Sequence, residues 1–581
     1  MRRTRSWARH GAFSALLLTA LGACGDGGGY ADLLPDGGGA GGDAPSEVDE
    51  TAALFDPDRI LDVAIEIDVA EWDALRAESR SHIGLLAGDA CLDEPFSKPF
   101  FKHPGAITVD GIRRAPVAIR KKGFLGSLSA TKPSLKIFLD AYIPGLELHG
   151  TDELVLNNSI QDPSYVRQCL AYDVFRRAGV PAPRCNFARV SVNGEDLGLY
   201  VHVEHVGKAM LRATYGEDDG TLYEGTLSDF RDGWEGTFEK ETHEDEPTMP
   251  GIQPLADALL VDDADLLTRL APLVDTREFS AFWATEVMLA HWDGYAGNTN
   301  NYYLYVARDG RMHFLPWGTD QTMQGRQRRD FPSVMAQGAL TRRLYELPET
   351  RAYYFARLRG VLETAWREDR MIADIERMHA LIARVADPDG SLDLAGKIEL
   401  VKTFVRDRQG GIEEELAEGP PTFTNPLRAP ICFDTIGTVS GTFTTTWGTI
   451  GAPDAMAAGD GALDATIRGT AKTFTQIGST AGFTPDTDSK RAQIAVVADD
   501  GTNDLTVLVL DVATPRVVPG LTTVIDWVSA QGVLYSVNKR SGEWTSIGWV
   551  GDGSIMFGAA SGDPGAPITG TFSAELIEIP D

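Results

Sequence analysis

Cysteine is scarce in the 581-residue sequence, which contains only five. Apart from Cys24 they are Cys91, Cys169, Cys185 and Cys432, and this scattered spacing lacks the paired pattern of a zinc site. A disulfide-dense scaffold is excluded by the same scarcity, although an exported protein can still form individual disulfides.

Basic residues are also under-represented, with 53 Lys and Arg against 84 Asp and Glu, for a formal charge of −31. An acidic surface repels phosphate backbones and anionic headgroups, so we expect neither a nucleic-acid partner nor electrostatic membrane binding. The charge is best interpreted as a solubility and habitat feature. A hydrophobic content of 43% indicates globular structure, and the length allows two or three domains of roughly 150 residues each.

The first 24 residues predict a lipoprotein signal peptide. Four arginines precede an apolar run over residues 12–21, which is too short for a stable membrane span. Leu21-Gly22-Ala23-Cys24 closes the run and resembles the bacterial lipobox, whose cysteine is diacylated and becomes the first mature residue. An ordinary secretory signal with a chance cysteine is the alternative. We expect membrane attachment only through this lipid anchor, followed by a disordered tether over residues 25–50.

The region after the tether is predicted to mix strands and helices. A helix is expected to begin at Asp162-Pro163 and to stop at Gly179, and the turn Asn193-Gly194 predicts a hairpin. The other predicted elements are strands over residues 60–67, 106–109, 112–121, 134–139, 187–192 and 197–205, and a short helix capped by Asp68.

The second half of the chain is predicted to be helical first and then all-β. Thr276 to Trp292 is the most periodic helical segment, and further helices are expected over residues 341–417. Gly419-Pro420-Pro421 marks a boundary. Beyond Pro430, short alternating runs rich in Thr, Gly and Val predict a separate β-sandwich-like module.

Residues 291–298, His-Trp-Asp-Gly-Tyr-Ala-Gly-Asn, carry the most informative motif. Asp293 and Asn298 match the H-x-D-x-x-x-x-N spacing of the protein-kinase catalytic loop. Such a loop needs one acceptor to orient and deprotonate the attacking hydroxyl and a second oxygen ligand to hold a metal ion. Asp and Asn in glycine-containing loops also serve ordinary turns, so the spacing alone leaves both interpretations open.

A predicted hairpin over residues 302–317 follows this loop and leads to another carboxylate, Asp320. In protein kinases a hairpin likewise separates the catalytic loop from the Asp that binds magnesium. Asp and Asn oxygens suit hard divalent cations such as Mg²⁺ and Mn²⁺. Asn300 and Asn301 remain alternatives to Asn298 as the amide ligand.

Many ordered motifs between about residues 60 and 415 resemble the CotH kinase family, the secreted atypical kinases of spore coats. They are Leu156-Asn157-Asn158, Gln161-Asp162-Pro163-Ser164, Arg167, Leu170-Ala171-Tyr172, Ala178-Gly179-Val180-Pro181-Ala182-Pro183, Val192-Asn193-Gly194, Gly198-Leu199-Tyr200, Glu204, Trp292-Asp293-Gly294, Asn301-Tyr302-Tyr303-Leu304-Tyr305 and Pro316-Trp317.

The resemblance implies an α+β, protein-kinase-like bilobal fold over residues 51–418, and the change in composition adds the small all-β, sandwich-like domain at residues 430–581. It implies ATP and Mg²⁺ or Mn²⁺ as cofactors, and a Ser or Thr hydroxyl of a protein substrate as the phosphate acceptor. Asp293 corresponds to the catalytic acceptor, with Asn298 and Asp320 as the expected metal ligands.

The second metal motif departs from the family pattern. It usually reads Trp-Asp-x-Asp, whereas this chain has Trp317-Gly318-Thr319-Asp320, so only the second carboxylate is present. A catalytically weak or inactive kinase-like surface scaffold is therefore the alternative to an active enzyme.

The smaller lobe is expected to contact the nucleotide. Arg120, Lys122, Lys132 and Lys136 match the family's basic pattern, in which a strand lysine reaches the phosphates, and the choice between Lys132 and Lys136 stays open. Glu204 stands where a hinge segment would contact the base. Solvated surface charges are the alternative interpretation for each of these residues.

Overall fold

The computed structural model describes residues 49–78, 91–96, 100–124, 126–324, 331–430, 432–452, 454–483, 491–525 and 529–578. The predicted signal peptide, the lipidation site Cys24 and almost all of the tether lie outside these residues. Within the described ranges, no helix is both long and apolar enough to span a bilayer.

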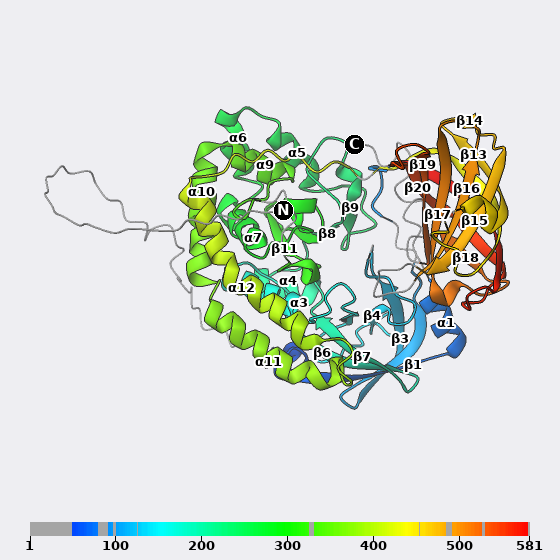
Figure 1. The fold of residues 1–581 in the computed structure, drawn as a ribbon. Helices are drawn as coiled ribbons and strands as arrows, with labels where there is room; N and C mark the ends of the chain where they lie inside the picture. Colours follow the sequence, from blue (N-terminus) through cyan, green and yellow to red (C-terminus); the bar gives the residue numbers. More distant parts are fainter. Residues whose placement is uncertain are drawn as a thin grey trace, which may run out of the picture. The chain divides into compact units, whose positions relative to one another are not determined.

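The smaller lobe is a closed seven-stranded barrel (Figure 1). Its strand order is β1-β2-β3-β4-β5-β7-β6, and parallel pairing of β1 with β6 closes it. The strands are β1 (Ile60–Ile67), β2 (His103–Val109), β3 (Ile112–Lys122), β4 (Ser134–Phe138), β5 (Glu153–Asn157), β6 (Cys185–Val192) and β7 (Glu195–Val203).

Alternation along β1 explains why it forms a barrel wall. Leu61, Val63 and Ile65 point into the barrel core, while the residues between them are more exposed. Asp68 then begins α1 (Val69–Ala77), because its carboxylate accepts the backbone N–H groups of Ala70 and Glu71. The sequence-based prediction of this strand and its capped helix is confirmed. The short 3-10 helix η2 (Glu50–Leu54) precedes them.

The helix predicted to begin at Asp162-Pro163 begins later, and that prediction is wrong at its start. α3 runs over Arg167–Arg177, and Tyr165 has φ +63°, a left-handed conformation that interrupts a helix. Asp162 instead organises the preceding turn, accepting from the backbone N–H groups of Ser164 and Arg167. The predicted stop holds, because Gly179 has φ +80° just after the helix.

The larger lobe combines helices with a four-stranded sheet of order β11-β10-β8-β9 (Figure 1). The sheet strands are β8 (Thr221–Gly225), β9 (Phe238–Lys240), β10 (Tyr302–Val306) and β11 (Met312–Pro316). The helices include α4 (Lys208–Tyr215), α5 (Ile252–Leu259), α6 (Asp263–Leu270), α7 (Thr276–Met288), α9 (Ala339–Glu346), α10 (Pro348–Thr364), α11 (Glu368–Ala386) and α12 (Leu394–Ala417).

Helix α7 is almost entirely buried inside this lobe. Asp275 caps it, and Trp283 stacks on Tyr354 of α10 with ring centroids 3.8 Å apart. The helix ends at Met288, before the predicted end at Trp292, because Ala290 adopts φ +50° and turns the chain. The residues between α7 and α8, 289–294, therefore form a loop at the end of a buried helix.

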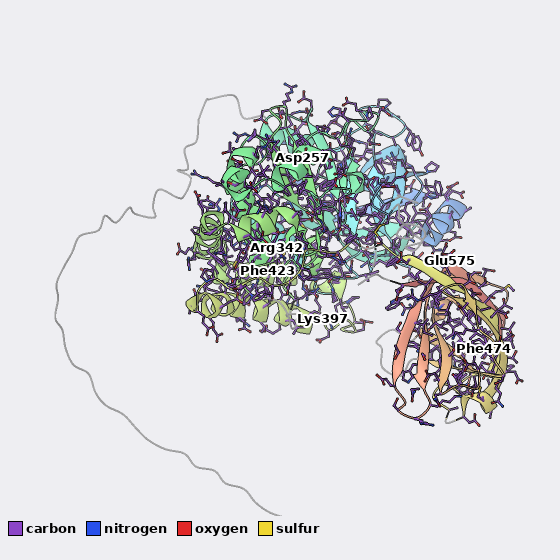
Figure 2. The ribbon with its side chains drawn as sticks, turned by 90° about the horizontal axis from the view of Figure 1, so that it is seen from above. Asp257, Arg342, Lys397, Phe423, Phe474 and Glu575 are labelled. Atoms are coloured by element: carbon purple, nitrogen blue, oxygen red, sulfur yellow. A yellow bond between two sulfur atoms is a disulfide. The ribbon has the colours of Figure 1, made fainter. Side chains whose placement is uncertain are left out.

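The C-terminal domain is all-β, as predicted, and its strands form one curled ten-stranded sheet. Its own core includes Val439, Phe443 and Ile494. Figure 2 draws the side chains of this domain, with Phe474 and Glu575 labelled. Its elements are β12 (Asp434–Thr446), α13 (Ala455–Ala458), β13 (Gly459–Ile467), β14 (Thr470–Ala471), β15 (Gln476–Phe483), β16 (Arg491–Asp499), β17 (Asp504–Ala513), η5 (Thr514–Arg516), β18 (Thr522–Ile525), β19 (Ala530–Asn538), β20 (Trp544–Ala559) and β21 (Pro567–Glu578).

All four cysteines in the described part of the chain are paired. Cys169 at the start of α3 bonds to Cys185 of β6, and Cys91 bonds to Cys432 across 341 residues of sequence. The sequence allowed disulfides but did not indicate which cysteines pair.

Candidate active site

A cavity of about 210 Å³ is lined by residues from both lobes. Its lining from β3 and β4 is basic, and its lining from the loop after α7 and the turn after β11 is acidic or amide. The lining includes Arg120, Lys122, Lys136, Asp293, Asn300, Asn301, Gly318 and Asp320. The structure thus brings the predicted catalytic residue and one predicted metal ligand into one cavity.

Three amide side chains hold the Asp293 carboxylate. Asn298 and Asn300 each donate from Nδ2 to Oδ1, at 2.6 and 3.1 Å, and Asn301 donates from Nδ2 to Oδ2 at 2.8 Å. Burial raises the pKa of Asp293, and these three hydrogen bonds and the charge of Arg428 act in the opposite direction. The carboxylate is therefore fixed in orientation by donors that favour its ionised form.

Glu286 of α7 supports the backbone of this loop. Its fully buried carboxylate accepts the N–H groups of Tyr295 and Ala296, at 2.9 and 2.8 Å, and so caps the single-turn helix α8 (Tyr295–Asn298). Burial raises the pKa of Glu286 to about 8, while the two N–H donors lower it. A Cβ atom at Gly294 would lie 2.2 Å from Glu286 Oε1, which explains the glycine after Asp293.

Asp320 lies in the short 3-10 helix η4 (Thr319–Gln321), after the β10–β11 hairpin. Loss of solvation raises its pKa to about 7, with the neighbouring Asp162 and Asp293 carboxylates in the same direction and Lys122 opposing them. Several acidic groups thus converge on this side of the cavity.

Gly318 has the left-handed φ of +50°, and its missing side chain makes room for Asn301. A Cβ atom there would lie 2.3 Å from Asn301 Oδ1. The Asn301 amide therefore has its nitrogen on Asp293 and its oxygen against Gly318, within the cavity lining that also includes Asp320.

The cavity lining contributed by β3 and β4 is cationic. Lys122 donates to Asn157 Oδ1 at 2.7 Å, and loss of solvation lowers its pKa to about 8. Lys136 forms an ion pair of 2.7 Å with Glu153, which His205 also contacts at 2.9 Å. Although burial raises the pKa of Glu153, His205 and Lys136 outweigh it and hold that pKa near 2.

Residues 119–410 match the family described as CotH kinase protein, and this match spans half of the chain. The chain belongs to the CotH kinase family. It is 24% identical over 293 residues to the inner spore coat protein H of Bacillus subtilis strain 168, covering 46% of this chain and 79% of that protein. It is also 24% identical over 247 residues to the invasin CotH7 of Rhizopus delemar, covering 38% of this chain and 41% of that protein.

Within this CotH domain, three of the predicted site residues lie away from the cavity lining. Lys132 donates to Tyr165 Oη at 2.9 Å, and Glu204 pairs with Arg184. Asn298 does not line the cavity, and its Oδ1 accepts from Arg428 Nε. Arg120 and Lys136 do line the cavity, as expected for contacts with a nucleotide.

Three features of the site escaped the sequence-based prediction. Glu286 left a signal, since it is the one acidic residue of α7 beyond the first turn, on the helix that precedes the loop of Asp293. The second feature is a group of three carboxylates on the cavity wall, Glu224, Glu239 and Glu241, whose oxygens lie within 4.8 Å of one another. Arg428, the third, follows the matched region and left no signal.

Proposed function

We propose that this CotH family member is an exported protein kinase that transfers the γ-phosphate of ATP to Ser or Thr hydroxyls and depends on Mg²⁺ or Mn²⁺. One observation carries the proposal. Asp293 is held by three amide donors in the same cavity as Asp320 and the cations of the smaller lobe. Such an arrangement serves an oriented acceptor beside a metal and a polyphosphate.

The residues present fit a divalent cation. Burial raises the pKa of Asp320, the neighbouring Asp162 and Asp293 carboxylates raise it further, and a hard cation would relieve their mutual repulsion. Asn301 Oδ1 is the amide oxygen best placed to join it, because the oxygen of Asn298 already accepts from Arg428 and that of Asn300 from the backbone N–H of Leu227. The bound ion would neutralise charge on the phosphates.

The chain's own groups account for the rest of the transfer. Asp293 orients the acceptor hydroxyl and takes its proton as the oxygen attacks the γ-phosphorus, and ADP leaves with the bridging oxygen. Lys122, Lys136 and Arg120 face the same cavity and would neutralise the phosphate oxygens. Of the two lysines left open by the sequence, the geometry supports Lys136 over Lys132.

Export is part of the proposal. The predicted lipobox at Cys24, the two disulfides, and relatives named as spore coat and invasin proteins all agree with a location outside the cytoplasm. The proposed partners are a protein substrate and the membrane through the lipid alone, with no nucleic acid.

A kinase-like surface scaffold without transfer activity is the second candidate, and Gly318 is the observation that favours it. The Trp-Asp-x-Asp pattern implied by the resemblance has an aspartate here, whereas this chain has a glycine. Loss of that carboxylate would weaken the metal site while leaving the fold intact.

The test is to incubate the purified body, residues 51–581, with γ-labelled ATP and Mg²⁺ or Mn²⁺. The proposal predicts metal-dependent labelling of the protein itself or of an added Ser- and Thr-containing substrate. Nucleotide binding without any labelling under either metal would support the scaffold instead.

A further inference from the structure

The linker segment, residues 419–430, is bound along the larger lobe. Tyr345 Oη donates to the carbonyl of Pro421 at 2.6 Å, and Arg342 donates to the carbonyl of Asn425. Between these points the ring of Phe423 packs against Arg342, whose guanidinium carbon is 5.1 Å from the ring centroid. Figure 2 labels both residues. These contacts fix the segment that follows the CotH match.

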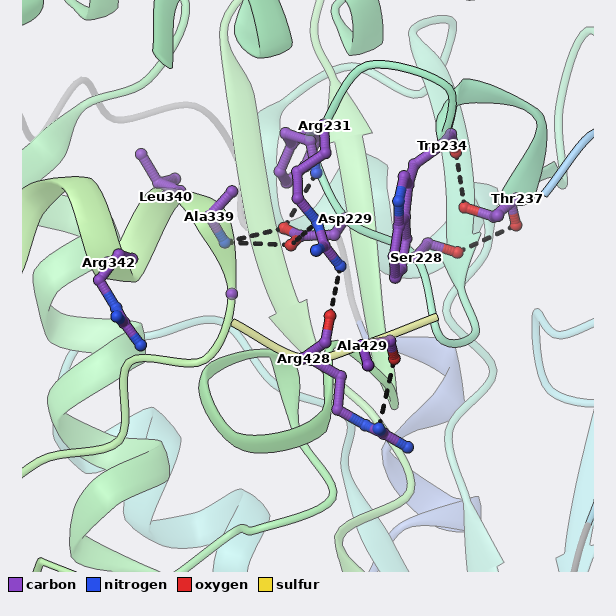
Figure 3. Close-up of polar contacts among 12 residues, drawn as sticks. Ser228, Asp229, Arg231, Trp234, Thr237, Ala339, Leu340, Arg342, Arg428 and Ala429 are labelled. Atoms are coloured by element: carbon purple, nitrogen blue, oxygen red, sulfur yellow. Dashed lines mark hydrogen bonds and ion pairs between the residues drawn. The ribbon is translucent and has the colours of Figure 1, made fainter. Parts of the chain in front are cut away.

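Two backbone hydrogen bonds then fix Arg428. Its N–H donates to the carbonyl of Gln337 at 2.9 Å, and its own carbonyl accepts from Arg231 Nη2 at 2.6 Å. Arg231 is in turn paired with the fully buried Asp229 at 2.9 Å (Figure 3). Asp229 also accepts from Tyr295 Oη at 3.1 Å, so one buried carboxylate joins the linker segment to the catalytic loop.

The side chain of Arg428 completes this connection. Its Nε donates to Asn298 Oδ1, and Asn298 Nδ2 donates to Asp293 Oδ1 at 2.6 Å. We infer that Arg428 is a positioning residue for the catalytic loop, which fixes the Asn298 amide so that its nitrogen faces Asp293. This inference rests on the proposed function, in which Asp293 receives the proton of the acceptor hydroxyl.

The physical reason is the two-sided nature of an amide. An Asn side chain can rotate by half a turn, which would place its oxygen against the Asp293 carboxylate and repel it. A guanidinium bonded to Oδ1 excludes that orientation, since it offers donors and no acceptor. The half-buried charge of Arg428 also acts on Asp293 and stabilises its ionised form. The CotH domain of this chain thus depends on a residue beyond position 410.

The experiment compares full-length wild type with Arg428→Ala and Arg428→Lys, using Arg342→Ala as the control because that side chain holds the linker segment without touching Asn298. For Arg428→Ala we expect kcat to fall about 10-fold to 100-fold, the range typical of residues that orient a reacting group, with the KM for ATP unchanged. Added guanidinium ion at low concentration should restore part of the rate. Arg428→Lys should retain more activity than Arg428→Ala but less than wild type, because it keeps the charge and loses the planar Nε donor.

Three results would overturn the inference. One is a wild-type kcat in Arg428→Ala, and another is a higher kcat, which would make the linker segment inhibitory. The third is an equal fall in kcat in Arg342→Ala and Arg428→Ala without rescue by guanidinium. In that case Arg428 would only hold the linker segment in place.

Hydrogen exchange separates this inference from the proposed function. If wild type transfers no phosphate, the proposed function fails, while the backbone amides of residues 293–301 still report on positioning. Faster exchange there in Arg428→Ala than in Arg342→Ala supports the inference, and equal exchange contradicts it.

Discussion

At the residue scale, the absence of a side chain at Gly318 allows Asn301 to line the same cavity as Asp320. Its left-handed φ and the 2.3 Å approach of Asn301 Oδ1 to a would-be Cβ leave room for a side chain only if Asn301 moves. Asn301 therefore occupies the space in which the family's aspartate would begin. The glycine at this position is thus coupled to the placement of a neighbouring amide oxygen.

This coupling predicts the outcome of restoring the family motif. Gly318→Asp should lower stability by about 1 kcal/mol, the scale of a side chain in the left-handed region, and should displace Asn301. Gly318→Ala is the matched control, because it brings the same strain without a carboxylate. We expect both variants to lose metal-dependent nucleotide affinity. A gain in Gly318→Asp over wild type would show that a missing ligand limits this protein.

The role of Asp320 leads to a second prediction. Asp320→Ala removes a carboxylate from the metal side of the cavity, so the affinity for nucleotide in the presence of Mg²⁺ should fall together with the transfer rate. Isothermal titration with and without metal measures this, and excess metal should partly rescue the variant. Unchanged metal dependence would remove Asp320 from the metal site.

At the scale of elements, the contact between α1 and β2 gives the smaller lobe a pH dependence. His103 of β2 bonds to Glu71 at 2.7 Å and to Glu78 at 2.8 Å. Burial alone would lower the pKa of His103, but the hydrogen bonds and charges of Glu78 and Glu71 raise it above 6.5. The protonated imidazole thus fastens α1 to the barrel.

The sign of the effect follows from linkage. Because the folded-state pKa of His103 is raised, its contribution to stability is fully present below pH 6.5 and is lost as the pH rises through the folded-state value. His103→Gln should therefore flatten the dependence of the unfolding midpoint on pH in that window. A pH profile of the variant parallel to that of wild type would contradict this assignment.

The elements also show how far sequence reasoning reaches. The β1 strand and its Asp68 cap follow from local alternation and side-chain chemistry, and both were predicted from them. The start of α3 did not follow, because a left-handed Tyr165 and the buried turn of Asp162 depend on packing against the rest of the domain. The motif around Asp293 led to the right cavity. It could not reveal that Asn298 turns its oxygen to an arginine 130 residues away.

At the scale of the whole molecule, the disulfides and the predicted lipid anchor both predict that the protein is exported. Non-reducing peptide mapping of protein isolated from the cell envelope should find the bonds Cys91–Cys432 and Cys169–Cys185. These bonds are expected because an oxidising compartment forms disulfides that the cytoplasm reduces. The same map should find Cys24 carrying lipid, as the predicted lipobox requires. Four free thiols in freshly isolated protein would contradict the proposed location.

The measurement that tests the account most directly is the rate of γ-phosphate transfer by Asp293→Ala beside wild type, at saturating ATP and Mg²⁺. Wild type should transfer, and Asp293→Ala should bind nucleotide and metal as before while its rate falls by at least about 100-fold, the low end for general acid–base groups. A variant that transfers phosphate as fast as wild type, or a wild type that binds nucleotide and transfers none, would contradict the central claim.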